Sequence, residues 1–133
     1  MEKISITTGR ILLGLYFLYP GITKISRYDF MVEYMTLHNI PLINILLPLT
    51  IVLQIVLGLM LITGYRVKEP ALILATLTIF INVGMHDFWN TYPGTDAGHE
   101  MQNFVKNLGI FAGLLVLSAS NNVSQLRLFN NSW

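Results

Sequence analysis

Four long apolar stretches constrain the fold of this chain more than any other feature of its sequence. They cover about residues 4–25, 41–64, 70–89 and 103–120. A helix needs roughly 20 mostly apolar residues to cross a bilayer, and each stretch is close to that length. The stretches are continuous rather than alternating, which favours helices over barrel strands. The sequence therefore predicts an all-α fold, a membrane-embedded four-helix bundle that forms one domain over residues 1–133.

The composition supports a lipid environment and excludes several classes of function. Hydrophobic residues make up 53% of the chain and charged residues 11%, a balance that would leave large apolar patches on a soluble domain. The chain has no cysteine, which excludes disulfides, thiolate metal sites and iron–sulfur clusters. Any redox chemistry must therefore use a borrowed cofactor or a partner. A net charge of +1 without a basic cluster argues against nucleic acid as a partner.

The connections between the stretches predict how the helices are arranged. Gly64 and Pro70 suit a helix end and a helix start, so the second and third spans should form an antiparallel hairpin. Between the first two spans, Phe30, Tyr34 and Leu37 recur at helical spacing, which predicts a short amphipathic helix on the outer surface. The polar segment 121–133 is expected to lie along the inner interface.

The positions of lysine and arginine predict the orientation in the membrane. The residues on the N-terminal side outnumber those on the opposite side, which predicts that both termini are cytoplasmic. The first group comprises Lys3, Arg10, Arg66, Lys68 and Arg127, and the second comprises Lys24, Arg27 and Lys106.

Arg10 is placed unusually deep for a charged residue. Thirteen residues separate it from Lys24, which is about 20 Å of helix in a hydrocarbon core about 30 Å thick. The main expectation is that the guanidinium extends to the nearby head groups. The alternative is that it faces the bundle interior, on a stripe with Gly14, Phe17 and Gly21 where another helix could approach closely.

Polar residues inside the spans predict a seam between the helices that opens outward. Asn82, His86 and Asn90 recur at four-residue intervals, Gln54 lies well inside the second span, and Asn107 belongs to the fourth. These amides also suit the simpler task of holding helices together. The pairs Gly109–Gly113 and Ala71–Ala75 are likewise packing signals.

His86, Asp87, His99, Glu100 and Lys106 bring acids, bases and a cation to one membrane depth. Such a group could exchange protons with a quinone or bind an anion, whereas Phe88 and Trp89 suit an interfacial anchor. A haem would need a second histidine opposite His86, but His38 and His99 fall on predicted loops. No metal-ligand spacing is present, so no metal site is expected.

The strings "GRILLGLYFLYPGITKI", "IVLGLMLITGYRVKEPALILATL", "HDFWN" and "FVKNLGIFAGLLVL" resemble the DoxX family of small bacterial membrane proteins. The resemblance covers nearly the whole chain, and the pairing of "HDFW" with "KNL" is its most specific part. The family's signature positions correspond here to Gly9, Arg10, Pro20, Gly21, Lys24, Gly58, Gly64, His86, Asp87, Phe88, Trp89, Lys106, Asn107 and Leu108.

The resemblance implies a multi-pass protein of the bacterial inner (cytoplasmic) membrane with four spans. It also implies an oxidoreductase association, either as the membrane subunit of a thiosulfate:quinone oxidoreductase or as a partner in thiol and oxidant defence. Many relatives carry a Glu in the second span, before the glycine that corresponds to Gly58, where this chain has Gln54. A proton relay through that position is therefore in doubt.

Together these features predict a membrane component of a quinone-linked or oxidant-handling assembly, with a polar site near the outer face. The alternative is a structural or assembly protein, and whether the chain is itself an enzyme is left open. The expected partners are lipid, a soluble or membrane oxidoreductase and a second copy of the chain; quinone is the candidate cofactor, with no covalent one. Candidate ligand or quinone-binding residues are His86, Asp87, Trp89, Lys106, Asn107, Lys24 and His99, and the intramembrane polar residues are Arg10, Gln54 and Asn82.

Overall fold

The computed structural model describes residues 1–120, which fold into five helices and confirm the expected all-α class. The helices are α1 (Glu2–Ser26), α2 (Tyr28–Leu37), α3 (Ile43–Thr63), α4 (Lys68–Met85) and α5 (Ala97–Ala119). The predicted position of segment 121–133 at the inner interface lies outside the described residues.

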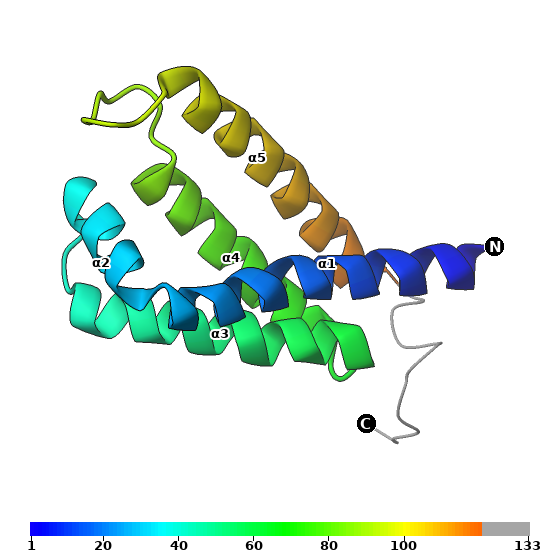
Figure 1. Cartoon of the computed structure of the whole chain (residues 1–133). Helices are drawn as coiled ribbons and strands as arrows, with labels where there is room; N and C mark the ends of the chain where they lie inside the picture. The colour runs from blue at the N-terminus through cyan, green and yellow to red at the C-terminus, as the bar shows by residue number, and fades with distance from the viewer. Residues whose placement is uncertain (121–133) are drawn as a thin grey trace.

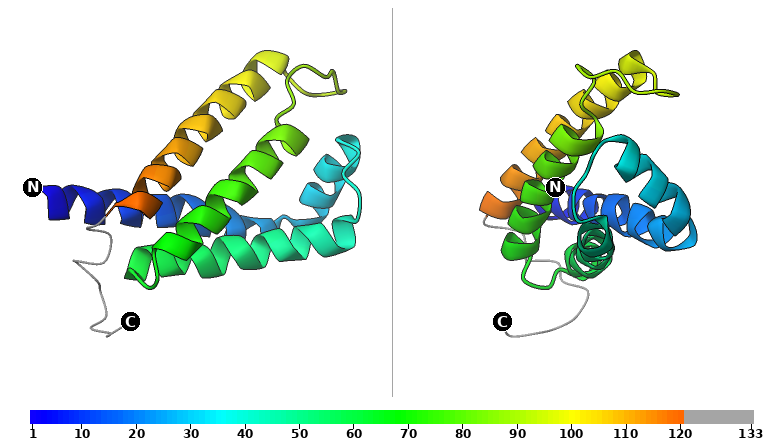
Figure 2. Two further views of the ribbon diagram at one scale, coloured as in Figure 1. Left: turned by 180° about the vertical axis from the view of Figure 1, so that it is seen from behind. Right: turned by 90° about the vertical axis from the view of Figure 1, so that its left-hand side faces the viewer.

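The four long helices form two closely packed pairs that diverge from each other. α1 packs along α3, and α4 packs along α5, whereas contacts between the pairs are fewer. Figure 1 shows the pairs spreading apart toward the end that carries α2 and the loop 86–96, and Figure 2 shows the same spread from behind. The N-terminus and the α3–α4 turn lie toward the opposite end. The fold is therefore a wedge with its open end between α2 and α5.

Glycines explain how closely α1 and α3 approach. A Cβ atom added at Gly14 would lie 2.7 Å from the backbone oxygen of Gly58 and 2.6 Å from Ile62. A Cβ atom at Gly58 would lie 2.9 Å from the backbone oxygen of Gly14. All three distances are below 3.0 Å, closer than a Cβ atom comes to another heavy atom, so the two helices pack here through their backbones. The expectation that the glycine stripe of α1 admits a second helix is confirmed.

Two clusters of buried apolar side chains hold the helices together. The larger joins α1, α3, α4 and α5 through residues such as Leu61, Leu74 and Leu114. The smaller lies toward the open end and comprises Met35, Leu47, Ile51 and Met85. The second cluster packs α2 against α3 and α4. Three of its residues, Met35, Leu47 and Met85, also line the candidate site.

The turn between α3 and α4 has the predicted design. Gly64 ends α3 in the left-handed region with φ 80°, and its backbone N–H bonds the carbonyl of Met60. Pro70 lies in the first turn of α4, where its missing N–H costs nothing. The two helices consequently fold back as neighbours.

Two helix ends differ from the approximate ends of the predicted spans. The third span was expected to continue to Trp89, but α4 ends at Met85 and His86 is its C-cap residue, with φ −120°. The predicted stripe of Asn82, His86 and Asn90 is thus broken, because Asn90 lies in the following loop. α5 begins at Ala97, earlier than expected, because the carboxylate of Asp96 caps it by accepting a bond from the N–H of Gly98.

Within residues 1–120, two helices are long and apolar enough to cross a membrane by length and composition, namely α3 and α4. α1 and α5 are longer, with 25 and 23 residues, but they carry more polar and charged groups.

The Gly109–Gly113 pair of α5 contrasts with the glycines of α1. No heavy atom lies within 4 Å of a Cβ atom built at either residue. The expectation that this pair marks close helix packing is wrong for the described part of this single chain.

Candidate functional site

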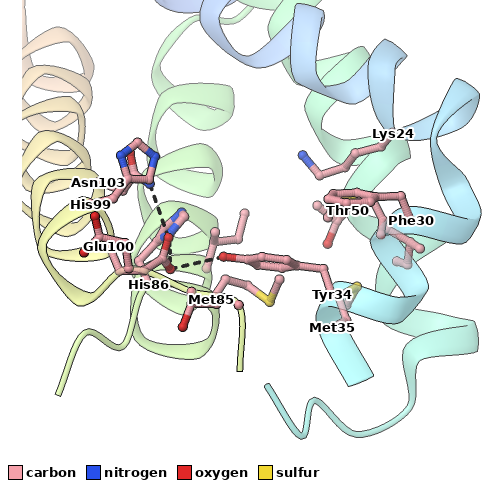
Figure 3. A pocket seen from close by; sticks show the side chains of 16 residues that line it. Lys24, Phe30, Tyr34, Met35, Thr50, Met85, His86, His99, Glu100 and Asn103 are labelled. Atoms are coloured by element: carbon pink, nitrogen blue, oxygen red, sulfur yellow. Dashed lines mark hydrogen bonds and ion pairs between the residues drawn. The ribbon is translucent and has the colours of Figure 1, made fainter. Parts of the chain in front are cut away.

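The open end of the wedge contains a cavity of about 560 Å³ between α2 on one side and the start of α5 on the other. Figure 3 shows side chains from α1, α2, α4 and α5 extending into it. Its polar lining residues are Lys24, Tyr34, Thr50, His86, Thr95, Asp96, His99, Glu100 and Asn103. The rest of the lining is mostly apolar and includes Phe30, Met35, Leu47 and Met85. A small number of polar groups in a mostly apolar cavity is typical of a ligand site.

Lys24 supplies the cation on one wall. It lies in the last turn of α1, and its ammonium donates a hydrogen bond of 3.0 Å to Oε1 of Gln54 on α3. An amide carries no charge, so this bond leaves the positive charge of Lys24 unneutralised. The ammonium has two further N–H groups for a ligand oxygen.

His86 and Glu100 form the opposite wall, which Figure 3 shows across the cavity from Lys24. Nδ1 of His86 lies 3.2 Å from Oε2 of Glu100, and the carboxylate side chain is only 10% exposed. The hydroxyl of Tyr34 on α2 donates to the same Oε2 atom over 3.2 Å. Glu100 thereby joins α2 to α4 and α5 across the mouth of the wedge.

The surroundings of Tyr34 hold its hydroxyl in the protonated form. Burial, followed by the nearby charge of Glu100 and the hydrogen bond to it, raises the pKa of Tyr34 to about 12. Tyr34 is therefore a stable hydrogen-bond donor at neutral pH. It can hold Glu100 in place without supplying a proton itself.

A second polar network lies beside the cavity, centred on Asp87. Its Oδ1 atom lies 3.0 Å from Nδ1 of His38, and its Oδ2 atom accepts bonds from Asn90 and from the hydroxyl of Tyr92. Burial alone would raise the pKa of Asp87, but the bonds from Asn90, Tyr92 and His38 outweigh it and lower the pKa. Asp87 is thus a charged anchor that fastens the loop after α4 to the end of α2.

A second cavity of about 390 Å³ continues toward the middle of the bundle, and it shares Lys24, Ile81 and His86 with the first. Next to it, the hydroxyl of Tyr16 donates to Asn107 over 2.9 Å. Asn107 in turn donates to the side-chain oxygen of Asn82 over 3.3 Å, and Asn82 donates to the carbonyl of Phe104. These amides satisfy one another, as expected for groups that hold helices together.

Arg10 faces the bundle interior, and its side chain is completely buried. It shares its buried stripe with Gly14, Phe17 and Gly21. The main expectation, that its guanidinium extends to the head groups, is therefore wrong, and the alternative is correct. Gly14 and Gly21 lie on the face of α1 that α3 covers, and Arg10 is buried because it lies on the same stripe.

The structure brings some of the predicted site residues together and separates others. Lys24, His86 and His99 line the outer cavity, and Asn107 lines the inner one. Asp87 lies beside the outer cavity within its own network. Lys106 and Trp89 line neither cavity: Lys106 lies on the exposed face of α5, and Trp89 is 54% exposed and packs on Phe88 and Phe104. Lys106, which was expected to belong to the same polar site as His86, lies outside the cavity, and Lys24 is the cation that lines it.

One histidine lies elsewhere than predicted, and three contributions were missed. His99 lies in the first turn of α5 rather than on a loop, whereas His38 lies in the α2–α3 connection as predicted, as the buried C-cap residue of α2. The contributions of Tyr16, Tyr34 and His38 were not predicted from the sequence. Tyr34 stood at helical spacing on a predicted surface helix, which was the only local signal. Across residues 1–120, no group of three or more His, Cys, Asp or Glu side chains is arranged to hold a metal ion.

A sequence model of the DoxX family matches residues 5–87. The chain belongs to the DoxX family. It is similar to the inner membrane protein YqjF of Escherichia coli K12, with 30% identity over an alignment that covers 100% of this chain and 98% of the relative. The inner membrane protein YphA of the same organism is 24% identical over 88% of this chain and 83% of its own length. No solved structure matches this DoxX protein.

Proposed function

We propose that this DoxX protein spans the inner membrane four times, through α1, α3, α4 and α5, with both termini cytoplasmic and α2 at the outer interface. The two relatives named above are inner membrane proteins by name. The N-terminus and the Arg66–Lys68 turn share one end of the wedge, as this orientation requires. Polar side chains of α1 and α5, including Arg10 and Asn107, face inward, which leaves apolar residues such as Leu12 and Val116 for lipid.

The absence of native cysteine permits a direct test of this orientation. A cysteine at Thr95, in the outer loop, should react with a membrane-impermeant maleimide added to intact spheroplasts. A cysteine at Arg66, in the α3–α4 turn, should react only after the membrane is opened. The reverse pattern would overturn the proposed orientation, and labelling of both sites from outside would overturn the four-span arrangement.

We further propose that the protein is a membrane component of a quinone-linked or oxidant-handling assembly, and that the outer cavity binds the quinone head group. The observation that carries this proposal is that Lys24 and the His86–Glu100 pair occupy opposite walls of one largely apolar cavity. A quinone has two carbonyl oxygens on opposite sides of a flat ring. Lys24 would donate to one oxygen, while His86 lies at the wall that the other would face.

The proton chemistry of the head group would depend on His86 and Glu100. A bound quinone supplies the electron acceptor of the site, and its reduction to a quinol consumes two protons. Glu100 orients the imidazole of His86 through Nδ1. His99 lines the same cavity and is exposed, so the cavity that holds the His86–Glu100 pair reaches the outer surface there. The electrons would come from a partner oxidoreductase, for which the thiosulfate:quinone type is the family precedent.

Binding of a short-chain quinone to the purified protein tests this role. His86→Gln and Lys24→Met should each weaken binding by about tenfold, the value expected for one lost charge-assisted hydrogen bond. Lys106→Met removes the same charge from the exposed face of α5 and should leave binding unchanged. Equal affinities in all four proteins, with intact folding, would overturn the quinone site.

A structural or assembly role is the second candidate, and one observation favours it. The deep amides are already satisfied within the chain, through Tyr16–Asn107–Asn82 and Lys24–Gln54. Under this role, His86→Gln and Lys24→Met would release partner proteins from the membrane complex. Separation of native complexes by electrophoresis distinguishes the two roles, because the quinone role predicts that the complex persists in both variants.

A further inference from the structure

A third cavity, which we call the α3–α4 groove, lies next to the outer cavity and differs from it in chemistry. Its volume is about 610 Å³, and among the residues 1–120 that line it only Thr50 and Thr76 have polar side chains. The hydroxyl of Thr76 is bonded to the carbonyl of Leu72, so it offers little to a polar ligand. The rest of the lining is apolar and includes Met35, Leu49, Ile73, Phe80 and Met85.

The groove and the outer cavity share four lining residues, Met35, Thr50, Ile81 and Met85. Figure 3 shows Met35, Thr50 and Met85 among the side chains of the outer cavity. Two of the four shared residues are methionines, whose unbranched side chains change shape more readily than those of leucine or isoleucine. These shared side chains separate the polar cavity from the apolar groove, and the two methionines allow the separation to change shape.

The groove also opens toward the side of the molecule that the proposed orientation turns to lipid. Phe80 is 71% exposed, Leu49 48% and Ile73 44%. α3 and α4 are held together at their turn and diverge toward the open end, which is the geometry that opens the groove between them. An apolar chain could thus pass from the bilayer to the edge of the polar cavity without meeting a charged group.

We propose that the ligand of the outer cavity is a long-chain amphipath, such as an isoprenoid quinone, whose chain lies in the α3–α4 groove. This inference rests on the quinone-binding function proposed above and adds the route of the chain. The head group meets Lys24 and His86 in the outer cavity. The isoprenoid chain passes the shared side chains Met35 and Met85 to reach the groove. The ligand enters sideways between α3 and α4, and a free polar molecule from outside water would have no use for the groove.

The test compares quinones that carry no chain, one isoprene unit, two and four, all measured in the same micelles. Ile73→Trp narrows the groove, and so does Gly84→Leu, because even a Cβ atom there would lie 3.2 Å from Ile40. Neither residue lines the outer cavity. Val83→Trp is the matched control, since Val83 is an exposed residue of α4 that is not part of the groove. Thermal unfolding confirms that each variant is folded.

In the unmodified protein, affinity should rise with chain length, and the groove variants should remove that rise while they bind the chainless quinone normally. The expected loss for the longest quinone is at least about fivefold, since the chain would exchange close packing in the groove for loose micelle contacts. Partition into micelles is identical for all variants, so it cancels from the ratio. Val83→Trp should behave as the unmodified protein does.

Two results would overturn the inference while the proposed function stands. One is that Ile73→Trp changes the affinity by the same factor for the chainless quinone and for every longer one. The other is an equal effect of Ile73→Trp and Val83→Trp. Failure of every quinone to bind, chainless or long, would overturn the proposed function itself and the inference with it.

Discussion

The α1–α3 interface and the open end of the wedge differ in how their helices are held together. At the interface, Gly14 and Gly58 bring two backbones into direct contact, and no cavity separates them. At the open end, α2 is joined to α4 and α5 across a cavity by hydrogen bonds between side chains, chiefly Tyr34–Glu100 and His38–Asp87. The α1–α3 interface is therefore the closely packed part of the fold, and the open end is the part that encloses a cavity. This arrangement holds polar side chains on opposite walls of that cavity.

The largest effect should follow from a change to the rigid region. Gly14→Ala places a methyl group against the backbone of α3, which must move away, and we expect a loss of about 3 kcal/mol of unfolding free energy. Gly109→Ala is the control, because its added methyl group meets open space; it should be neutral or stabilising by up to about 1 kcal/mol. Unfolding in mixed micelles measures both. Similar losses in the two variants would remove the distinction between the regions.

The next effect concerns the connection at the open end. Asp87→Leu leaves His38, Asn90 and Tyr92 without their acceptor, and we expect a loss of about 2 kcal/mol. Hydrogen exchange should show the change mainly in the loop 86–96 and α2, with the α1–α3 interface unaffected. Asp29→Leu, at an exposed site on α2, is the control and should change exchange little. Uniformly faster exchange throughout the chain would contradict the division into two regions.

The pH dependence of the same connection follows from the lowered pKa of Asp87. A carboxyl group with a lowered folded pKa stabilises the protein above its ordinary pKa, and this contribution is lost as the pH falls through the folded value. Protection of the loop 86–96 should therefore persist at about pH 4, near the ordinary pKa of aspartate, and decline only below it. Loss of protection already at pH 6 would contradict a charged Asp87 anchor.

The smallest effect lies at alkaline pH, at Tyr34. A raised folded pKa stabilises the protein below the ordinary tyrosine value, and the contribution is lost as the pH rises through about 12. Absorbance of the phenolate should show ionisation near pH 12, and Tyr34→Phe should remove the contribution of one tyrosine there. Glu100→Gln removes the neighbouring charge and should bring that ionisation to lower pH. An unchanged titration in Glu100→Gln would argue against the Tyr34–Glu100 bond.

The sequence was informative where structure follows from local periodicity. The helical stripe of Arg10, Gly14, Phe17 and Gly21 is buried as a unit, as the alternative interpretation of Arg10 required, and the Gly64–Pro70 turn forms as expected. Asn82 and Gln54 face inward because a polar group in lipid has few other places to go.

The sequence failed where contacts join distant segments or where one residue step matters. His38 meets Asp87, 49 positions away, and Tyr34 meets Glu100, 66 positions away, so no local pattern could reveal either pair. Lys106 and Asn107 are adjacent, yet one step on a helix turns about 100°, which places the lysine outside and the amide inside. The end of α4 at Met85 was missed because the residues that follow it, His86 to Asn90, include no glycine or proline.

Site-resolved photolabelling tests the central claim most directly. A quinone with a photoreactive group on its ring should attach to the lining of the outer cavity, in peptides that contain Tyr34, His86 or His99. An excess of unlabelled quinone should prevent the reaction, and so should Lys24→Met. Attachment confined to exposed positions of α5 such as Val105 and Val116, unaffected by competitor, would contradict the claim that this cavity holds the head group.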